Sequence, residues 1–122
     1  MSVENITHGI AENFKITKQL KLEHLKVTLA ADNYAITVDH PTVLMIDPAA
    51  ATRDVILPLE TSSKGLVFLI FNLSDAASED IVVKNNADNA TIATITTATG
   101  LPECGIFFCD GVTWRGGVLK VT

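Results

Sequence analysis

Apolar and polar residues alternate along most of this chain with the period of two that is typical of β-strands with one solvated face. From Tyr34 onward, β-branched and aromatic residues gather in short runs, and turn residues separate the runs at a spacing of roughly 8–12 residues, as in sandwiches and barrels. The runs predict strands near residues 35–38, 42–46, 53–57, 66–72, 80–84, 91–96, 105–109, 113–114 and 118–121. No connection between them has room for a crossover helix, so we expect mostly antiparallel pairing. The sequence therefore predicts an all-β domain over residues 35–122, either an antiparallel β-sandwich or a compact β-barrel-like domain.

The first 34 residues predict an extended N-terminal arm or a strand pair in front of this domain. Apolar residues recur there at even spacing, and the alternation resumes after a shift of phase near His24; they are Phe14, Ile16, Leu20 and Leu22, then Leu25, Val27 and Leu29. A helix over residues 11–25 is the alternative, because Leu, Lys and Glu are good helix formers. Four of the nine basic residues lie in the same segment: Lys15, Lys18, Lys21 and Lys26. This basic cluster is either a contact surface for a partner or the solvated face of an edge strand, where lysines discourage unwanted pairing.

Two stretches depart from the alternation. Residues 66–71 and 106–109 are apolar without interruption. A strand of an antiparallel sheet with one wet face does not need apolar residues on both sides. Both faces of these two strands therefore require cover, which is expected either from the middle of a tight sandwich or from a neighbouring copy of the protein.

Composition and charge narrow the classes of function. The chain has 122 residues, of which 48% are hydrophobic and 19% charged, which suits one folded domain. Its formal net charge of −5 argues against a nucleic-acid partner held through phosphates. No run approaches the roughly 18 apolar residues of a membrane span, and the N-terminus lacks the regions of a secretory signal. We therefore expect no nucleic-acid partner, no membrane partner, and a protein made and kept in a cytoplasm.

Candidate chemistry is sparse. The chain contains no Gly-x-Ser-x-Gly, Gly-x-x-x-x-Gly-Lys, His-Glu-x-x-His or Cys-x-x-Cys motif. His8, His24 and His40 stand apart from one another, and each is expected to be solvated or to cap a turn. Cys104 and Cys109 would lie on opposite faces of one strand, about 16 Å apart, which is too far for a disulfide. We expect no catalytic residues, no metal and no cofactor.

Two further features near the C-terminal end of the sequence are a predicted turn and the single tryptophan. Asp110–Gly111 suits a two-residue hairpin turn of type I′, in which both central residues have positive φ. Trp114 follows this turn, after Val112 and Thr113. If exposed, its flat ring would suit a carbohydrate-stacking platform; if buried, it would close one end of the core with its N–H on a backbone carbonyl.

An ordered series of short motifs runs from residue 35 to residue 114. The motifs are Pro41-Thr42-Val43-Leu44-Met45-Ile46-Asp47-Pro48, Arg53-Asp54-Val55-Ile56-Leu57-Pro58, Lys64-Gly65-Leu66-Val67-Phe68-Leu69-Ile70-Phe71-Asn72, Ile81-Val82-Val83-Lys84 and Phe107-Phe108-Cys109-Asp110-Gly111-Val112-Thr113-Trp114. In this order they resemble a β-module of tailed-bacteriophage virion proteins, most often head decoration (cement) proteins and also head and tail fibres. The first 34 residues fall outside the resemblance.

The resemblance implies a structural protein on the outer capsid surface of a virion. Proteins of this kind typically form homotrimers at three-fold and quasi-three-fold positions, where they bridge subunits of the major capsid protein and stabilise the head. On this reading we expect core or oligomer contacts from Phe68, Ile70, Phe107 and Trp114. We expect capsid contacts from Phe14, Lys15, Ile16, Lys18, Leu20, Lys21, Leu22 and Lys26. The alternative is a receptor- or carbohydrate-binding module of a phage fibre, which requires an exposed Trp114.

Overall fold

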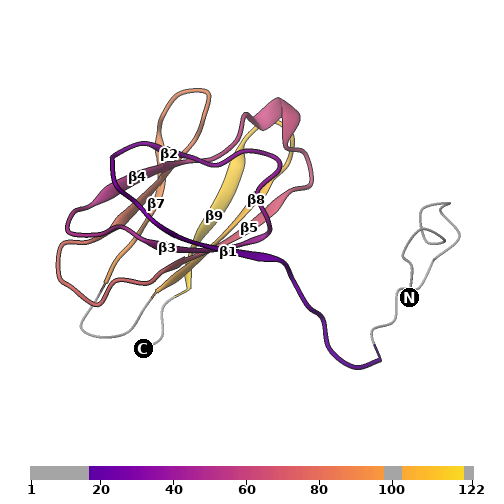
Figure 1. The fold of residues 1–122 in the computed structure, drawn as a ribbon. Helices are drawn as coiled ribbons and strands as arrows, with labels where there is room; N and C mark the ends of the chain where they lie inside the picture. Colours follow the sequence, from indigo (N-terminus) through magenta and orange to yellow (C-terminus); the bar gives the residue numbers. More distant parts are fainter. Residues whose placement is uncertain (1–16, 98–102, 120–122) are drawn as a thin grey trace, which may run out of the picture.

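The strands of this protein account for nearly all of its regular structure. The computed structural model describes residues 17–97 and 103–119 (Figure 1). Its strands are β1 (His24–Thr28), β2 (Tyr34–Ala35), β3 (Val43–Asp47), β4 (Arg53–Ile56), β5 (Val67–Asn72), β6 (Ile81–Lys84), β7 (Thr91–Ile95), β8 (Cys104–Cys109) and β9 (Trp114–Leu119), with one short 3₁₀ helix, η2 (Glu60–Ser62). The all-β prediction is confirmed.

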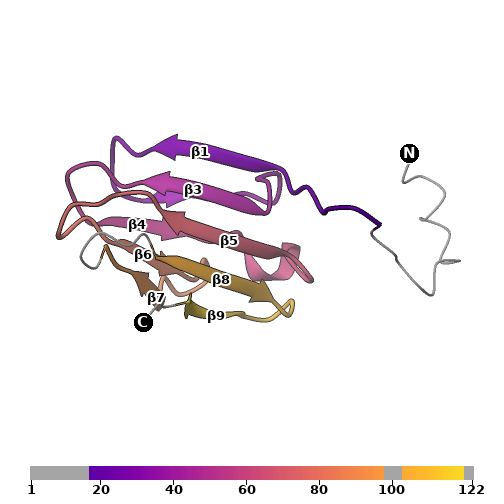
Figure 2. The ribbon, with the colours of Figure 1, turned by 90° about the horizontal axis from the view of Figure 1, so that it is seen from below.

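The strands form two sheets. Sheet A has the order β1-β3-β5-β8-β9, and sheet B has the order β2-β4-β6-β7. From β1 to β6 the chain alternates between the sheets, one strand at a time, so sequence neighbours in this stretch never pair with each other. Figure 2 looks onto sheet A, with the strands of sheet B behind it.

Pairing within the sheets differs from the predicted antiparallel arrangement. The pairs β1–β3, β3–β5, β2–β4 and β4–β6 are parallel, and only β5–β8, β8–β9 and β6–β7 are antiparallel. The expectation of mostly antiparallel pairing is therefore wrong, and both sheets are mixed. Parallel strands need a crossover, and here a strand of the other sheet provides it in place of a helix: β3 and β5, for example, are connected through β4.

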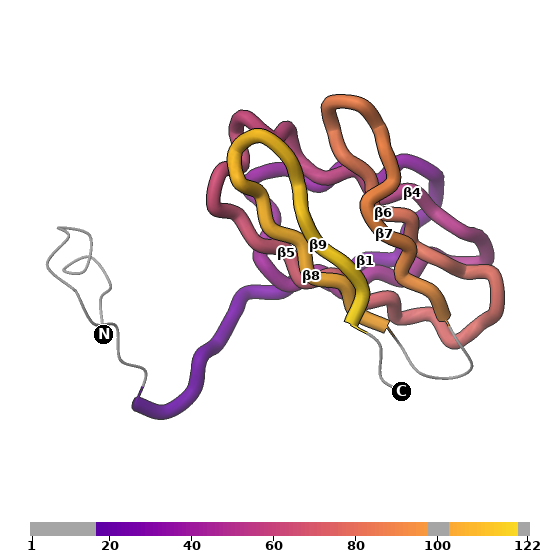
Figure 3. Tube along the Cα trace, turned by 180° about the vertical axis from the view of Figure 1, so that it is seen from behind, coloured from indigo at the N-terminus to yellow at the C-terminus, as the bar shows by residue number. Residues whose placement is uncertain are grey.

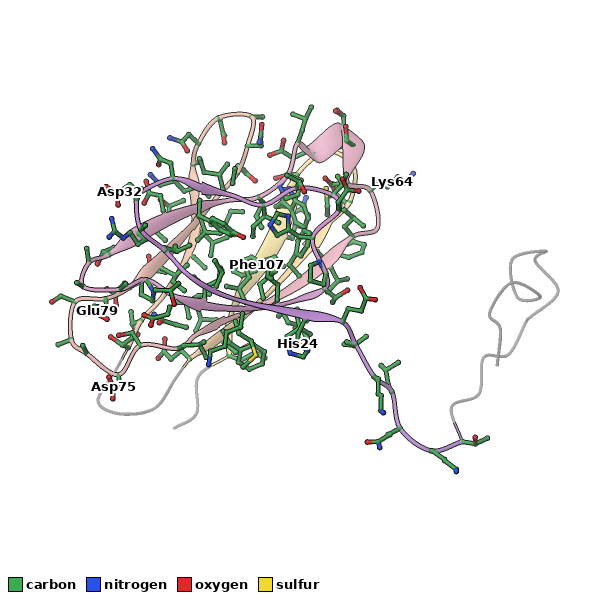
Figure 4. The ribbon with its side chains drawn as sticks, viewed as in Figure 1. His24, Asp32, Lys64, Asp75, Glu79 and Phe107 are labelled. Atoms are coloured by element: carbon green, nitrogen blue, oxygen red, sulfur yellow. The ribbon has the colours of Figure 1, made fainter. Side chains whose placement is uncertain are left out.

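Inward-facing side chains of both sheets share one core. They are Leu29, Ile36, Leu44, Ile46, Val55, Leu57, Phe68, Ile70, Ile81, Val83, Ile95, Phe107, Cys109 and Trp114. In β3, β5 and β8 every second residue is buried, which is the burial pattern of strands with one face toward a core. Phe107 lies between the two sheets in Figure 4.

The C-terminal strand is longer than predicted. The sequence suggested separate strands at 113–114 and 118–121 with a break at Gly116–Gly117, but β9 continues through both glycines. Neither glycine has a positive φ. Residues 120–121 lie outside the described residues.

In the N-terminal segment, β1 belongs to the folded domain, whereas the described residues before it form an exposed segment. β1 is an edge strand of sheet A, paired with β3, and Leu29 after it is buried in the core. Residues 17–23 precede β1 and belong to no strand or helix, so the helical alternative is wrong for the described part of 11–25. This segment, which we call the arm, runs away from the two sheets (Figures 1 and 3).

Candidate functional site

The side of sheet A that faces away from the core is an apolar surface, which we call the outer face of sheet A. Its apolar members are Val43, Met45, Val67, Leu69, Phe71, Cys104, Ile106, Phe108 and Leu119. The most exposed are Ile106 at 41%, Phe108 at 47% and Leu119 at 57%. In Figure 2 no described segment of the chain crosses this face.

The strand register explains why these side chains meet. Val67 lies opposite Phe108 and Leu69 opposite Ile106 across the antiparallel β5–β8 pair. Val43 lies beside Leu69 across the parallel β3–β5 pair. Because cross-strand partners point to the same side of a sheet, the centre of the face is a continuous row of uncharged side chains.

Charged residues on the outer face of sheet A lie at its margins. Lys26 is on the edge strand β1, Arg115 is on the opposite edge strand β9, and Asp47 is the last residue of β3. Figure 4 shows His24 of β1 on the side of the sheet away from Phe107. The margins are thus polar and the centre is not.

The outer face of sheet B has a different chemistry. Asp54 of β4 and Lys84 of β6 form an ion pair with an Nζ–Oδ2 distance of 2.6 Å, and Thr94 of β7 is exposed. The half-buried Ile56 and Val82 lie on the same face, so polar and apolar side chains are mixed here, as expected of a sheet that faces water. The two outer faces of the domain are therefore not equivalent.

The arm is exposed along its described length. Lys18, Leu20, Lys21 and Leu22 are all exposed, with Leu20 at 62% and Leu22 at 43%. Lys26, within β1, is exposed as well. The other three residues that were expected to contact a capsid, Phe14, Lys15 and Ile16, lie outside the described residues.

All four residues expected at core or oligomer contacts lie in the core. Phe68, Ile70, Phe107 and Trp114 are each at most 3% exposed. The members of the outer face of sheet A were not among the predicted contact residues. They include the sequence neighbours of the buried residues, namely Val67, Leu69, Ile106 and Phe108. The uninterrupted apolar runs were the signal for this surface, since one half of each run faces the core and the other half does not.

Trp114 is a core residue and not a stacking platform. Its Nε1 donates a hydrogen bond of 2.8 Å to the carbonyl oxygen of Pro58. Its ring packs on Phe68 with centroids 5.6 Å apart. The exposed Trp114 that a carbohydrate-binding module requires is therefore contradicted, and the tryptophan closes one end of the core.

The β8–β9 turn is built around Asp110. Its Oδ1 accepts hydrogen bonds from the backbone N–H groups of Val112 and Thr113, both at 2.8 Å, and its Oδ2 lies 3.2 Å from Nε of Arg115. The backbone donors first, and then Arg115, hold the pKa of this carboxyl below its usual value. Of the turn residues only Gly111 has positive φ, at +93°, so the predicted type I′ geometry is wrong.

Two other carboxylates fix backbone segments. Oε1 of Glu60 accepts hydrogen bonds from the N–H groups of Asn86 and Ala87 at 3.1 and 3.3 Å. Oε2 of Glu103 accepts from the N–H and the hydroxyl of Thr96 at 3.0 and 2.8 Å. Both glutamates are largely buried. They serve the fold by tying loops and strand ends together.

Asn72, at the end of β5, joins the two sheets. Its Nδ2 donates to the carbonyl oxygens of Glu79 and Ile95 at 2.9 and 3.1 Å, and its Oδ1 accepts from the N–H of Ser74 at 3.0 Å. The Ser74 hydroxyl in turn donates to the Glu79 carboxylate. The hydrogen-bonding groups of Asn72, Ser74 and Glu79 are thus satisfied within this network.

His40 and Tyr34 are paired with each other. Nδ1 of His40 accepts from the N–H of Thr37 at 3.0 Å, so Nε2 carries the proton that faces the Tyr34 hydroxyl 3.0 Å away. Burial raises the pKa of Tyr34 and of the Cys104 thiol above their usual values. Cys104 and Cys109 are both free thiols, as the spacing predicted.

Residues 17–97 and 103–119 contain no group of three or more His, Cys, Asp or Glu side chains arranged to hold a metal ion. The same residues contain no helix long and apolar enough to cross a membrane. No protein-family model matches the chain, and no curated protein or solved structure matches it in comparison. The resemblance to phage decoration proteins therefore stays a prediction from the sequence motifs.

Proposed function

We propose that this chain is a non-enzymatic decoration (cement) protein of a tailed-bacteriophage head. In this proposal its two sheets form a β-sandwich, and it acts as a homotrimer on the outer surface of the virion, at three-fold and quasi-three-fold sites. Its partners are the major capsid protein and further copies of itself. The proposal rests on the ordered motifs between residues 35 and 114 together with the disposition of the arm.

The observation that supports it most directly is the exposed arm on an acidic body. Residues 24–97 and 103–119 hold five Lys and Arg against eleven Asp and Glu, whereas the described arm, residues 17–23, holds two lysines, Lys18 and Lys21, against Glu23 on an extended, uncovered segment. Leu20 and Leu22 are exposed between them. An extended segment with exposed apolar and basic side chains suits contact with a second protein surface better than it suits solvent.

The described carboxylates support a structural role in a second way. Glu60, Glu103 and Asp110 each accept hydrogen bonds from backbone N–H groups through one carboxylate oxygen, which stabilises the fold locally. Catalytic acids and bases need instead to reach a substrate. The proposed mechanism is therefore stapling: several weak contacts, repeated by symmetry, add up because each bound copy raises the effective concentration at the next site.

The test is co-sedimentation of the full-length chain with capsids assembled from the major capsid protein of the same phage. We expect the wild-type chain to pellet with the capsids and Lys21→Glu to bind several-fold more weakly, because it reverses a charge on the arm. Lys64→Glu is the matched control, since Lys64 is an exposed lysine on the body, away from the arm (Figure 4). No binding by the wild type, or equal weakening by both variants, would overturn the proposal.

A further inference from the structure

We infer that the outer face of sheet A is the surface through which one copy of this chain contacts another. The inference rests on the self-association contained in the proposed function and assigns it to particular residues. Ile106 and Phe108 of β8 are two of its most exposed members, and they lie beside Leu69 and Val67 of the central strand β5. The four residues expected at core or oligomer contacts are buried in the core and leave this surface to other side chains; they are Phe68, Ile70, Phe107 and Trp114.

The two outer faces of the domain differ in their exposed side chains. On the outer face of sheet B, the half-buried Ile56 and Val82 alternate with the Lys84–Asp54 ion pair, and Thr94 is exposed. Sheet A presents a continuous row of apolar side chains on three adjacent strands, β3, β5 and β8. Scattered exposed apolar residues are ordinary, but a contiguous apolar patch rimmed by polar residues marks an interaction surface.

The distribution of charge is what allows a second copy to occupy this face. The described body carries eleven Asp and Glu and five Lys and Arg, so two copies repel each other through most of their surface. On the outer face of sheet A, Asp47 is the one carboxylate, and Lys26 and Arg115 lie on the two edge strands. Acidic chains therefore meet one another with the least electrostatic cost through this face, where few carboxylates would be brought together.

The size of the face sets the strength of the contact. Five strands about 4.8 Å apart, with about 3.3 Å per residue along the six-residue strands β5 and β8, span an area of about 400 Å². A standard interface buries about 800 Å² on each partner, so this face alone supports weak and reversible association. Copies of this chain are thus expected to associate at high concentration in solution and to be held firmly only where further contacts add to this one.

The experiment is sedimentation velocity of the full-length chain from about 1 µM to about 1 mM, the range in which weak interfaces of this size dissociate. We expect the average mass of the wild type to rise with concentration above that of one chain. Ile106→Glu should weaken the association about tenfold or more, because it places an unpaired charge in the contact. Val38→Glu is the matched control, since Val38 is an aliphatic residue of similar exposure, 45% against 41%, outside sheet A.

Ile106→Thr serves as a second variant. It removes apolar contact without adding charge and keeps a β-branched residue in the strand, so it tests the face even if the glutamate disturbs folding. The inference is overturned if the wild type has the mass of one chain throughout, or if both Ile106 variants associate as the wild type does. Capsid co-sedimentation is a separate readout: capsid binding by a chain that stays monomeric contradicts this inference alone, whereas self-association without capsid binding contradicts the proposed function alone.

Discussion

The ring of Phe107 occupies the space that a side chain on Gly116, the residue directly opposite it across the β8–β9 pair, would need. A Cβ on Gly116 would lie 2.7 Å from Cδ1 of Phe107 and would also collide with the carbonyl oxygen of Ile106. The same ring covers Gly105 on its own strand, where an added Cβ would lie 2.6 Å from Cε2 of Phe107. One buried aromatic ring thus explains why positions 105 and 116 are both glycine. It also explains why Gly116 lies within a strand and does not mark a turn.

This packing predicts the cost of adding a single methyl group. Gly116→Ala should lower the free energy of unfolding by about 1–3 kcal/mol, because overpacking against a backbone oxygen cannot be relieved by a side-chain rotation. Gly117→Ala is the matched control, since no atom lies within 4 Å of its added Cβ. Urea denaturation followed by circular dichroism measures both. Equal stability of the two variants would contradict the close approach of Phe107.

The burial of Trp114 predicts a structural role for its N–H group. Trp114→Phe keeps an aromatic ring against Phe68 but leaves the carbonyl of Pro58 without its donor, so we expect a loss of about 1–3 kcal/mol in the free energy of unfolding. The wild-type tryptophan should also emit at short wavelength and resist quenching by acrylamide, because it is 3% exposed. Phe108→Leu, at an exposed aromatic, is the control and should change stability little. Free access of acrylamide to Trp114 would contradict its placement in the core.

The lowered pKa of Asp110 predicts a dependence of stability on acid. Because the pKa in the folded chain lies below the ordinary value of 3.8, the ionised carboxylate stabilises the fold above that pH, and this contribution is lost as the pH falls through the folded pKa. Asp110→Asn keeps an oxygen acceptor for Val112 and Thr113 but removes the charge near Arg115. Thermal melts at pH 7 and at steps below pH 3.8 should show the wild type more stable at pH 7 and the difference shrinking with acid. A difference that does not vary with pH would show that the charge of Asp110 has no role in the turn.

The strands themselves follow from local sequence. Most predicted strands lie within a few residues of observed ones, because β-branched and aromatic runs and the turns between them are local signals. The free thiols of Cys104 and Cys109 followed from strand geometry in the same way. What the local pattern does not contain is the partner of each strand. β4 connects two parallel strands of the other sheet, and nothing in residues 53–56 distinguishes this arrangement from a hairpin.

The sequence predicted that an apolar surface exists outside the core, but not which residues form it. The unbroken run 66–71 shows that both sides of β5 need cover, but it does not say which side faces the core. Phe68 and Leu69 are equally apolar, and the burial of one and not the other is set by packing against strands far away in the chain. Likewise the break expected at Gly116 was wrong because glycine was interpreted as a turn residue, whereas here it makes room for Phe107.

Asn72 predicts the largest single loss of stability among the polar residues. It is completely buried, and its side chain makes three hydrogen bonds that link the end of β5 to Glu79, Ile95 and Ser74. Asn72→Ala leaves two carbonyl oxygens and one N–H group without these partners, so the free energy of unfolding should fall by about 3–5 kcal/mol.

Two further variants separate lost hydrogen bonds from lost volume. Asn72→Leu restores apolar volume but none of the bonds, so it should be nearly as unstable as Asn72→Ala if the unpaired backbone groups cause the loss. Asn86→Ala is the control, because the Asn86 amide makes one hydrogen bond, of 3.2 Å to the carbonyl of Leu57, from an exposed residue, and its removal should cost about 1 kcal/mol. Chemical denaturation of all three gives the comparison. If Asn72→Leu is as stable as the wild type, packing and not polar pairing holds this end of the two sheets together.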